Sequence, residues 1–124
     1  MQLKINNNEY TMNYGFSAID YLDKEYYAEL SATKLGFGIQ LVITQLRAQN
    51  VMALVHMIKA GTSTAVKKPS NDDIEAFIGA LSIEEFDALC EEFIEELKKQ
   101  PLTRVTALKM CEKMEKEASK KDKA

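Results

Sequence analysis

The first 27 residues change from a strand-like to a helix-like spacing of apolar side chains, and this change limits how the chain can fold. On both sides of three asparagines, apolar residues alternate with polar ones: Leu3, Ile5, Tyr10, Met12 and Tyr14. A period of two predicts two half-buried strands. Asparagine tolerates the left-handed backbone of a tight turn, so Asn6-Asn7 or Asn7-Asn8 can close a β-hairpin. Both registers keep the same apolar side chains on one face, so the pattern leaves the register open.

A helix is predicted directly after Gly15, where the period of two ends. Its apolar stripe has the spacing of one helix face: Ile19, Leu22 and Tyr26. Ser17 followed by Asp20 is typical of a helix cap, and Phe16 is spaced from Tyr21 as in a hydrophobic staple. The polar stretch 27–34 is predicted to close this helix. Because an isolated two-stranded hairpin is only marginally stable in water, we expect the hairpin to pack on helices, beginning with this one.

Five further apolar stripes predict five more helices, within residues 39–46, 51–58, 74–81, 83–97 and 105–114. Asn50 is predicted to cap the second of these helices, and Gly61 to end it in the left-handed conformation. Two capping boxes mark the starts of the third and fourth: Ser70 with Asp73, and Ser82 with Glu85. Pro101 is predicted to stop the fourth helix.

The sequence therefore predicts a mainly α-helical fold, in which an N-terminal two-stranded β-hairpin packs on a bundle of five or six short helices. Residues 1–116 are predicted to form one domain, which suits the length of the chain. Residues 117–124 are nearly all charged and are predicted to form a flexible, disordered basic tail. Gly36-Phe37-Gly38 predicts a sharp bend or a close backbone approach, whereas a phosphate-binding loop would need a third glycine.

Charged residues are unevenly distributed along the chain. The segment from Pro69 to Leu97 contains ten acidic residues and no Lys or Arg, whereas Lys98 to Ala124 carries a net charge of +5. General nucleic-acid binding needs a basic face, so the acidic segment argues against it. Only the basic tail is compatible with a DNA-binding regulator. No apolar run reaches the ~18 residues that span a membrane. We also expect no secretory signal, because no basic region precedes an apolar core at the N-terminus.

No group of side chains in the sequence has the composition and spacing of a catalytic or metal site. His56 stands alone at the edge of an apolar stripe, which favours a packing role. Two acidic pairs lie one helical turn apart: Glu91-Glu92 and Glu95-Glu96. That spacing suits metal ligands, but a solvated acidic face has it too, and we favour the face. Cys90 and Cys111 lack redox spacing and are expected to be buried, reduced thiols. We therefore expect no enzyme activity, metal or cofactor.

The predicted helices offer more apolar side chains than one small core needs. This excess favours a protein that self-associates or holds another helix. Met52 and Met57 lie beside the central stripe, and methionine side chains suit adaptable binding surfaces. With Phe37 and Ile39, they are the candidate partner-binding residues. A well-packed monomer without a free apolar face is the alternative, and the sequence is equally compatible with it.

Several short motifs follow one another over nearly the whole chain: Leu3-Lys4-Ile5-Asn6 with Glu9-Tyr10, Tyr14-Gly15-Phe16, Tyr21-Leu22-Asp23-Lys24-Glu25-Tyr26, Gly36-Phe37-Gly38, Lys68-Pro69-Ser70, and Glu96-Leu97-Lys98-Lys99 before Pro101-Leu102-Thr103. Their order and spacing resemble the tail assembly chaperones of long-tailed, siphovirus-type phages of Gram-positive bacteria. None of the motifs is catalytic. The chain departs from the family pattern at Asn7, where the glycine of an Asn-Gly turn is expected, although asparagine can adopt the same backbone.

The resemblance implies a chaperone that binds the tape measure protein during tail assembly and then leaves. Such a protein acts in the host bacterial cytoplasm and is absent from the mature virion. A holdase needs apolar surface for its client and charge elsewhere to stay dissolved, and the acidic residues between 72 and 96 supply that charge.

The resemblance further implies a longer form made by ribosomal frameshifting, whose extension contacts the tail tube protein. An A-rich run that encodes Lys120-Lys121 would be a suitable slippery site. We expect the chain to form a homo-oligomer, without nucleic-acid or membrane partners. The alternative function is a small helical interaction or regulatory module, a scaffold without chaperone activity.

Overall fold

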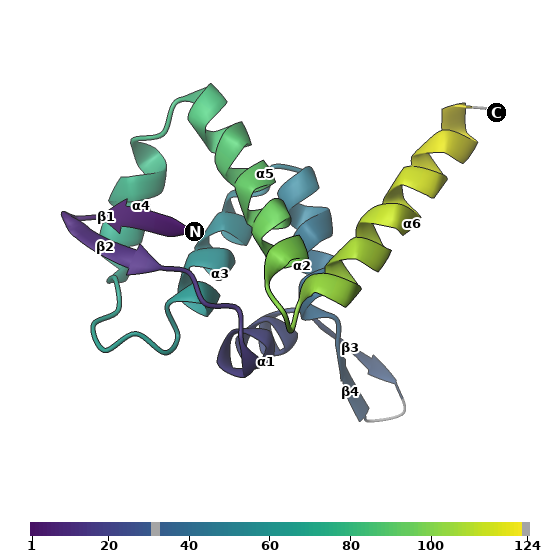
Figure 1. The fold of residues 1–124 in the computed structure, drawn as a ribbon, viewed down its shortest axis with the longest axis horizontal. Helices are drawn as coiled ribbons and strands as arrows, with labels where there is room; N and C mark the ends of the chain where they lie inside the picture. The colour runs from purple at the N-terminus through teal and green to yellow at the C-terminus, as the bar shows by residue number, and fades with distance from the viewer. Residues whose placement is uncertain (31–32, 123–124) are drawn as a thin grey trace.

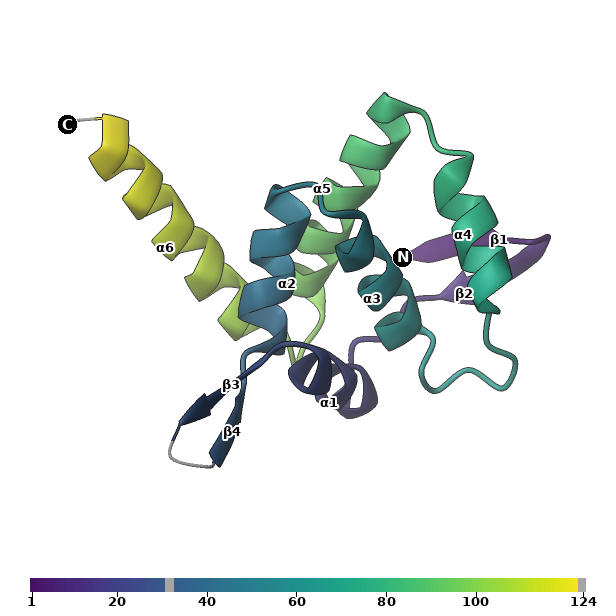
Figure 2. The same cartoon turned by 180° about the vertical axis from the view of Figure 1, so that it is seen from behind.

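An N-terminal hairpin, six helices and a second hairpin make up this computed structural model, which describes residues 1–30 and 33–122. The elements in chain order are β1 (Gln2–Ile5), β2 (Asn8–Thr11), α1 (Phe16–Glu25), β3 (Tyr27–Leu30), β4 (Thr33–Gly36), α2 (Gly38–Arg47), α3 (Val51–Gly61), α4 (Asn71–Gly79), α5 (Ile83–Lys99) and α6 (Arg104–Asp122). Helices α2, α3 and α5 lie in the middle, with β1, β2 and α4 on one side and α6 on the other (Figures 1 and 2). The predicted mainly helical fold with an N-terminal hairpin is confirmed.

The N-terminal hairpin turns at Asn6 and Asn7, whose φ angles are 49° and 63°. This turn sets the register, with Ile5 opposite Asn8. The structure thus chooses the first of the two registers that the sequence left open. Two consecutive residues with positive φ give a turn whose twist matches that of the flanking strands. The Asn6 side chain also donates a hydrogen bond to Asp73 of α4 at 3.0 Å, which ties the turn to that helix.

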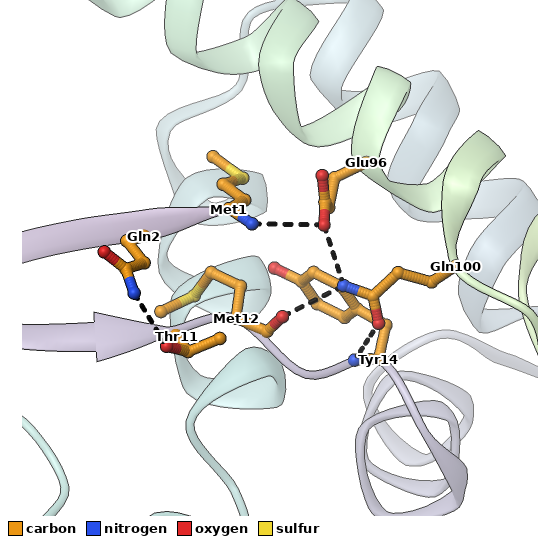
Figure 3. A network of polar contacts seen from close by, with 7 residues as sticks. All are labelled: Met1, Gln2, Thr11, Met12, Tyr14, Glu96 and Gln100. Atoms are coloured by element: carbon orange, nitrogen blue, oxygen red, sulfur yellow. Dashed lines mark hydrogen bonds and ion pairs between the residues drawn. The ribbon is translucent and has the colours of Figure 1, made fainter.

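Gln100, the residue after α5, joins the N-terminal segment to this helix (Figure 3). Its side-chain amide N–H groups donate to the Met12 carbonyl oxygen at 2.9 Å and to the Glu96 carboxylate at 3.0 Å. Its side-chain oxygen accepts a hydrogen bond from the Tyr14 N–H at 2.7 Å. The Met1 amine lies 3.3 Å from the same Glu96 carboxylate. These contacts fix the segment between the hairpin and α1 on the end of α5.

Acid is expected to weaken this network, because it removes the charge of Glu96. Burial raises the Glu96 pKa, but the hydrogen bonds from Gln100 and the Met1 amine outweigh it and hold the pKa below its usual 4.5. The contribution to stability is therefore complete above pH 4.5 and is lost as the pH falls through the lowered pKa. We expect Glu96→Gln to lower the free energy of unfolding by about 1 kcal/mol at neutral pH.

Urea unfolding of both proteins across a pH series measures this effect. The difference between wild type and Glu96→Gln should shrink as the pH falls through the lowered pKa of Glu96, because wild-type Glu96 then becomes protonated as well. A difference that stays constant over the whole series would contradict this role of the Glu96 charge.

Helix α1 begins before its predicted cap. Gly15 is the N-cap residue, and no side chain bonds the first N–H groups. The predicted cap at Ser17 and Asp20 is therefore wrong. Ser17 lies in the first turn instead, and its hydroxyl is 2.9 Å from the Ser63 hydroxyl in the loop after α3. This side chain connects α1 to that loop rather than ending its own helix.

The hydrophobic staple predicted at the same place is also wrong. Phe16 is 77% exposed, so it does not pack on Tyr21. Tyr14 decides this outcome, because its ring is fully buried and its backbone N–H is held by Gln100. The chain then enters α1 in a direction that turns Phe16 toward solvent.

A second hairpin follows α1, where the sequence analysis predicted a polar stretch that closes the helix. Strand β3 pairs antiparallel with β4, with Tyr27 opposite Gly36 and Ala28 opposite Leu35. The earlier prediction for this stretch is wrong. All residues of β4 are exposed, so no alternation of buried and exposed side chains marks the strand in the sequence.

The Gly36-Phe37-Gly38 motif permits a close backbone approach, as the sequence predicted. A Cβ on Gly38 would lie only 2.6 Å from the carbonyl carbon of Leu22 in α1. The Gly38 N–H donates to the Asp23 carboxylate at 2.8 Å, which satisfies one of the free N–H groups in the first turn of α2. The motif thus presses the end of α1 against the start of α2.

Helix α3 begins as predicted, since the Asn50 side-chain oxygen accepts a hydrogen bond from the Met52 N–H at 3.0 Å. The left-handed ending predicted at Gly61 is wrong, because none of the described glycines has a positive φ. A Cβ on Gly61 would lie 2.7 Å from the Met12 sulfur and 3.0 Å from the Tyr14 hydroxyl. Glycine is therefore needed there so that α3 can touch the N-terminal segment.

Both capping boxes predicted for α4 and α5 are present. In each, the serine hydroxyl accepts from the backbone N–H of the acidic residue: Ser70 with Asp73 at 3.0 Å, and Ser82 with Glu85 at 3.1 Å. Helix α5 ends at Lys99, ahead of Pro101. Its apolar stripe is buried in the core: Leu89, Cys90, Phe93, Ile94 and Leu97.

Helix α6 packs on α2 and α5 near its start and then projects away from the body (Figure 1). Ala107 and Cys111 are buried, and Cys111 and Cys90 are free thiols, as expected. The helix continues to Asp122, although the side chains of residues 115–120 are exposed. Residues 123–124 lie outside the described part of the chain. The domain boundary at residue 116 and the flexibility of the tail beyond it stay predictions.

Candidate functional site

His56 joins α1 to α3. Its Nδ1 atom lies 2.7 Å from the Tyr26 hydroxyl, and its Nε2 atom lies 3.5 Å from a Glu25 carboxylate oxygen. Burial lowers the pKa of His56, and burial with the nearby Glu25 and Tyr21 raises the pKa of Tyr26 to about 12. Both groups are therefore uncharged near neutral pH. Such a weakly acidic hydroxyl holds its proton, so the contact stabilises the packing of the two helices.

Three glutamates of the acidic pairs of α5, Glu91, Glu92 and Glu95, are exposed and form a solvated face, whereas Glu96 is partly buried against Met1 and Gln100. Among the described residues, no group of three or more His, Cys, Asp or Glu side chains is placed to hold a metal ion. Two of the exposed glutamates pair with basic side chains: Glu95 with Lys98 at 3.0 Å, and Glu91 with Arg47 at 3.9 Å. These exposed carboxylates supply negative charge on one side of the molecule.

An apolar groove of about 510 Å³ opens between α3 and α4. We call it the α3–α4 groove, and its apolar lining comes from both helices: Val51, Met52, Val55, Ile74 and Ile78. Lys59 and Glu75 also line it, so its rim carries one charge of each sign. Gly79 at the end of α4 leaves open space, because a Cβ there would meet no atom within 4 Å.

Local sequence explains why this groove stays open. The Asn50 cap starts α3 so that Val51 and Met52 stand on its first turn, where both are about half exposed. The two buried residues of α4 are Ile74 and Ile78. Because α4 is short and packs through this narrow stripe, it covers only part of α3.

A second apolar groove, of about 660 Å³, lies between the start of α2 and α6. We call it the α2–α6 groove. Phe37, Leu41 and Met110 form its apolar floor, and Lys109 and Lys113 stand on its α6 side. The two lysines are one helical turn apart, so they share one face of α6. Unlike the α3–α4 groove, this groove is lined by charges of a single sign.

The structure separates the four residues that the sequence proposed as partner-binding. Phe37 is 36% exposed and lines the α2–α6 groove, whereas Met52 is 48% exposed and lines the α3–α4 groove. Ile39 is only 5% exposed and Met57 is fully buried, so both belong to the core. The two accessible residues therefore lie in different grooves.

Sequence reasoning missed three residues that line these grooves, Leu41, Val51 and Met110, and the exposure of Ile83 at the start of α5. Leu41 is an apolar residue that falls off the buried stripe of α2, which contains Ile39, Val42, Ile43 and Leu46. The sequence therefore did contain a signal for Leu41: an apolar side chain that lies outside the buried stripe of its own helix. No comparable signal exists for Val51, which was assigned to the buried stripe of α3.

In the part of the chain that the structure describes, every helix is too short or too polar to cross a membrane. Comparison with curated proteins and with solved structures gives no significant match. A family model described as phage tail assembly chaperone protein, TAC, matches residues 2–112. This range runs from β1 into α6 and contains the whole α3–α4 groove. The chain therefore belongs to the phage tail assembly chaperone family.

Proposed function

We propose that this protein binds the tape measure protein during tail assembly and keeps it in solution, with the α3–α4 groove as the client site. The observation that carries the proposal is an open groove with an apolar lining in a chain of this family. Met52 stands half exposed at its edge, and a methionine side chain adapts to different client surfaces. An amphipathic client helix would place its apolar face against this lining.

The charge pattern supports a role in holding an apolar client. The rim of the α3–α4 groove carries one lysine and one glutamate, so it favours neither sign of charge on the client. The neighbouring α5 presents exposed carboxylates, which keep a complex of this protein with a poorly soluble helix dissolved. No step of this function forms or breaks a covalent bond, so the proposed protein is not an enzyme.

The rest of the proposal concerns the course of assembly. The chaperone acts in the host bacterial cytoplasm and leaves before the virion is mature. A longer form made by ribosomal frameshifting near the end of the reading frame would contact the tail tube protein. We also propose that the chain self-associates, because a second exposed apolar groove is available apart from the client site.

Co-expression with the tape measure protein tests the client role. Wild type should keep the client in the soluble fraction, and Met52→Glu should reduce the soluble client by about tenfold or more. Burial of an unpaired carboxylate costs several kcal/mol, and 1.4 kcal/mol corresponds to a factor of ten in affinity. Val66→Glu is the matched control, because Val66 is fully exposed in the loop before α4 and should tolerate the change.

Three outcomes would contradict the proposal. Client solubility that is the same with and without this protein would exclude chaperone activity. A client that binds but stays insoluble would favour the alternative, an interaction module that acts as a scaffold. Equal losses in Met52→Glu and Val66→Glu would exclude the α3–α4 groove as the client site.

A further inference from the structure

Two exposed features are not used by the client site. The first is the α2–α6 groove, where Phe37 and Leu41 stand beside Lys109 and Lys113. Neither of these lysines forms an ion pair with a carboxylate of the described residues. An apolar floor with two unneutralised ammonium groups fits a ligand that is apolar at its tip and negatively charged around it.

The second feature is the corner at which α5 begins. Ile83, the first residue of α5, is 79% exposed, although it begins the apolar sequence pattern of this helix. The capping box of Ser82 and Glu85 fixes the first turn, so Ile83 has a defined position. Glu84 and Asp87 lie on the same side of the helix, because residues three or four apart share a face. The corner is thus an apolar knob with two carboxylates beside it.

The knob and the groove lie at different ends of the molecule. The α4–α5 corner is at the top in Figures 1 and 2, whereas the start of α2 and the base of α6 are at the opposite, lower side. The body of the protein, with α2, α3 and α5, lies between them. Each copy of the chain therefore carries both halves of a complementary contact on separate surfaces. The knob of one copy can reach only the groove of a second copy.

We propose that the Ile83 corner of one copy binds in the α2–α6 groove of a second copy. Ile83 contacts Phe37 and Leu41, while Glu84 and Asp87 approach Lys109 and Lys113. A contact between two different patches is heterologous, so each added copy leaves one free knob and one free groove. The assembly is an open, head-to-tail chain. The inference specifies the self-association proposed above, and it does not depend on client binding.

The chemistry of the contact sets its strength. One apolar side chain and two charge pairs make a small interface, well below the ~1,200–2,000 Å² of stable complexes, so the assembly is weak and depends on protein concentration. Exposed charge pairs are screened by salt, with a Debye length of about 3 Å at 1 M ionic strength. Assembly should therefore weaken as salt is added, although the apolar contact remains.

Sedimentation velocity over a range of concentrations tests the contact in the absence of client. Wild type should form species larger than a dimer as its concentration rises. Leu41→Glu, which spoils the groove, and Ile83→Glu, which spoils the knob, should each remain monomeric. A mixture of these two variants should form a 1:1 complex and nothing larger, because only the intact groove of Ile83→Glu can receive the intact knob of Leu41→Glu.

Charge-reversal variants give an independent test of the contact. They carry less risk to folding, because the side chain is charged both before and after each substitution. Lys109→Glu with Lys113→Glu should abolish assembly, and so should Glu84→Lys with Asp87→Lys. Mixing the two double variants should restore open chains in which the two variants alternate, because the unchanged knob fits the unchanged groove and the reversed knob fits the reversed groove. Val66→Glu is again the matched control and should assemble as wild type does. Circular dichroism and thermal melts identify any variant that fails to fold.

Three results would overturn the inference. They are a wild type that stays monomeric at all concentrations, single variants that assemble as wild type does, and mixtures that stay monomeric although both components are folded. A wild type that stops at a dimer would also overturn the open chain. Client solubility in co-expression is measured separately, so failure of this interface is distinguishable from failure of the chaperone proposal.

Discussion

Phe93→Ala is expected to lower the free energy of unfolding by about 3–5 kcal/mol, the cost typical of truncating a fully buried aromatic side chain. Phe93 is fully buried in the middle of α5, where this helix packs against α2 and α6. The substitution removes the ring from the core and leaves a cavity that neighbouring helices fill only in part. A domain of this size has a total stability of about 5–15 kcal/mol, so a large share would be lost.

Urea unfolding followed by circular dichroism measures the change. The midpoint should fall while its slope stays the same, since the surface exposed on unfolding changes little. Phe16→Ala is the matched control, because Phe16 has the same side chain but is largely exposed at the start of α1. The control should change stability by no more than about 0.5 kcal/mol. Similar losses in the two variants would contradict the burial pattern.

Gly38→Ala is expected to cost about 3 kcal/mol, although it adds only one methyl group. The new Cβ would lie 2.6 Å from the Leu22 carbonyl carbon and 2.7 Å from the Asp23 backbone nitrogen. Backbone atoms cannot rotate away as a flexible side chain can, so α1 and α2 must separate. That separation also lengthens the 2.8 Å hydrogen bond from the Gly38 N–H to the Asp23 carboxylate. The cost lies at the upper end of the range for overpacked cores.

Gly79→Ala is the control for this substitution. A Cβ on Gly79 meets no atom within 4 Å, and its φ is not positive. Alanine should therefore stabilise the protein by about 0.4–1 kcal/mol, because it reduces the conformational freedom of the unfolded chain. The two glycines should thus give changes of opposite sign in thermal and urea unfolding. A Gly38→Ala protein as stable as wild type would show that α1 and α2 approach each other less closely.

The parts of the fold that the sequence predicted correctly depend on neighbouring residues. The capping boxes of α4 and α5 and the Asn50 cap of α3 each need side chains only two or three positions apart. The buried stripes of α2 and α5 follow from the helical period. A turn within the three asparagines follows from the tolerance of asparagine for positive φ, whereas its position at Asn6 and Asn7 was decided by the structure.

The incorrect predictions concern places where a distant contact decides the local structure. Gln100 is 86 residues from Tyr14, yet its hydrogen bond to the Tyr14 N–H directs the chain into α1 and leaves Phe16 exposed. The ending of α3 at Gly61 depends on Met12 and Tyr14, which press against it. The second hairpin is defined by backbone pairing between exposed strands, which no pattern of side chains records.

The sequence by itself determined which helices form and where most of them begin, because caps and apolar periods act within one or two turns. It also determined the family, through short motifs distributed along the chain, and the separation of acidic from basic segments. Only the tertiary structure decided which apolar side chains stay accessible. Packing buried Ile39 and Met57 but left Met52 and Phe37 exposed in two grooves, since a side chain's accessibility depends on the helices that happen to cover it.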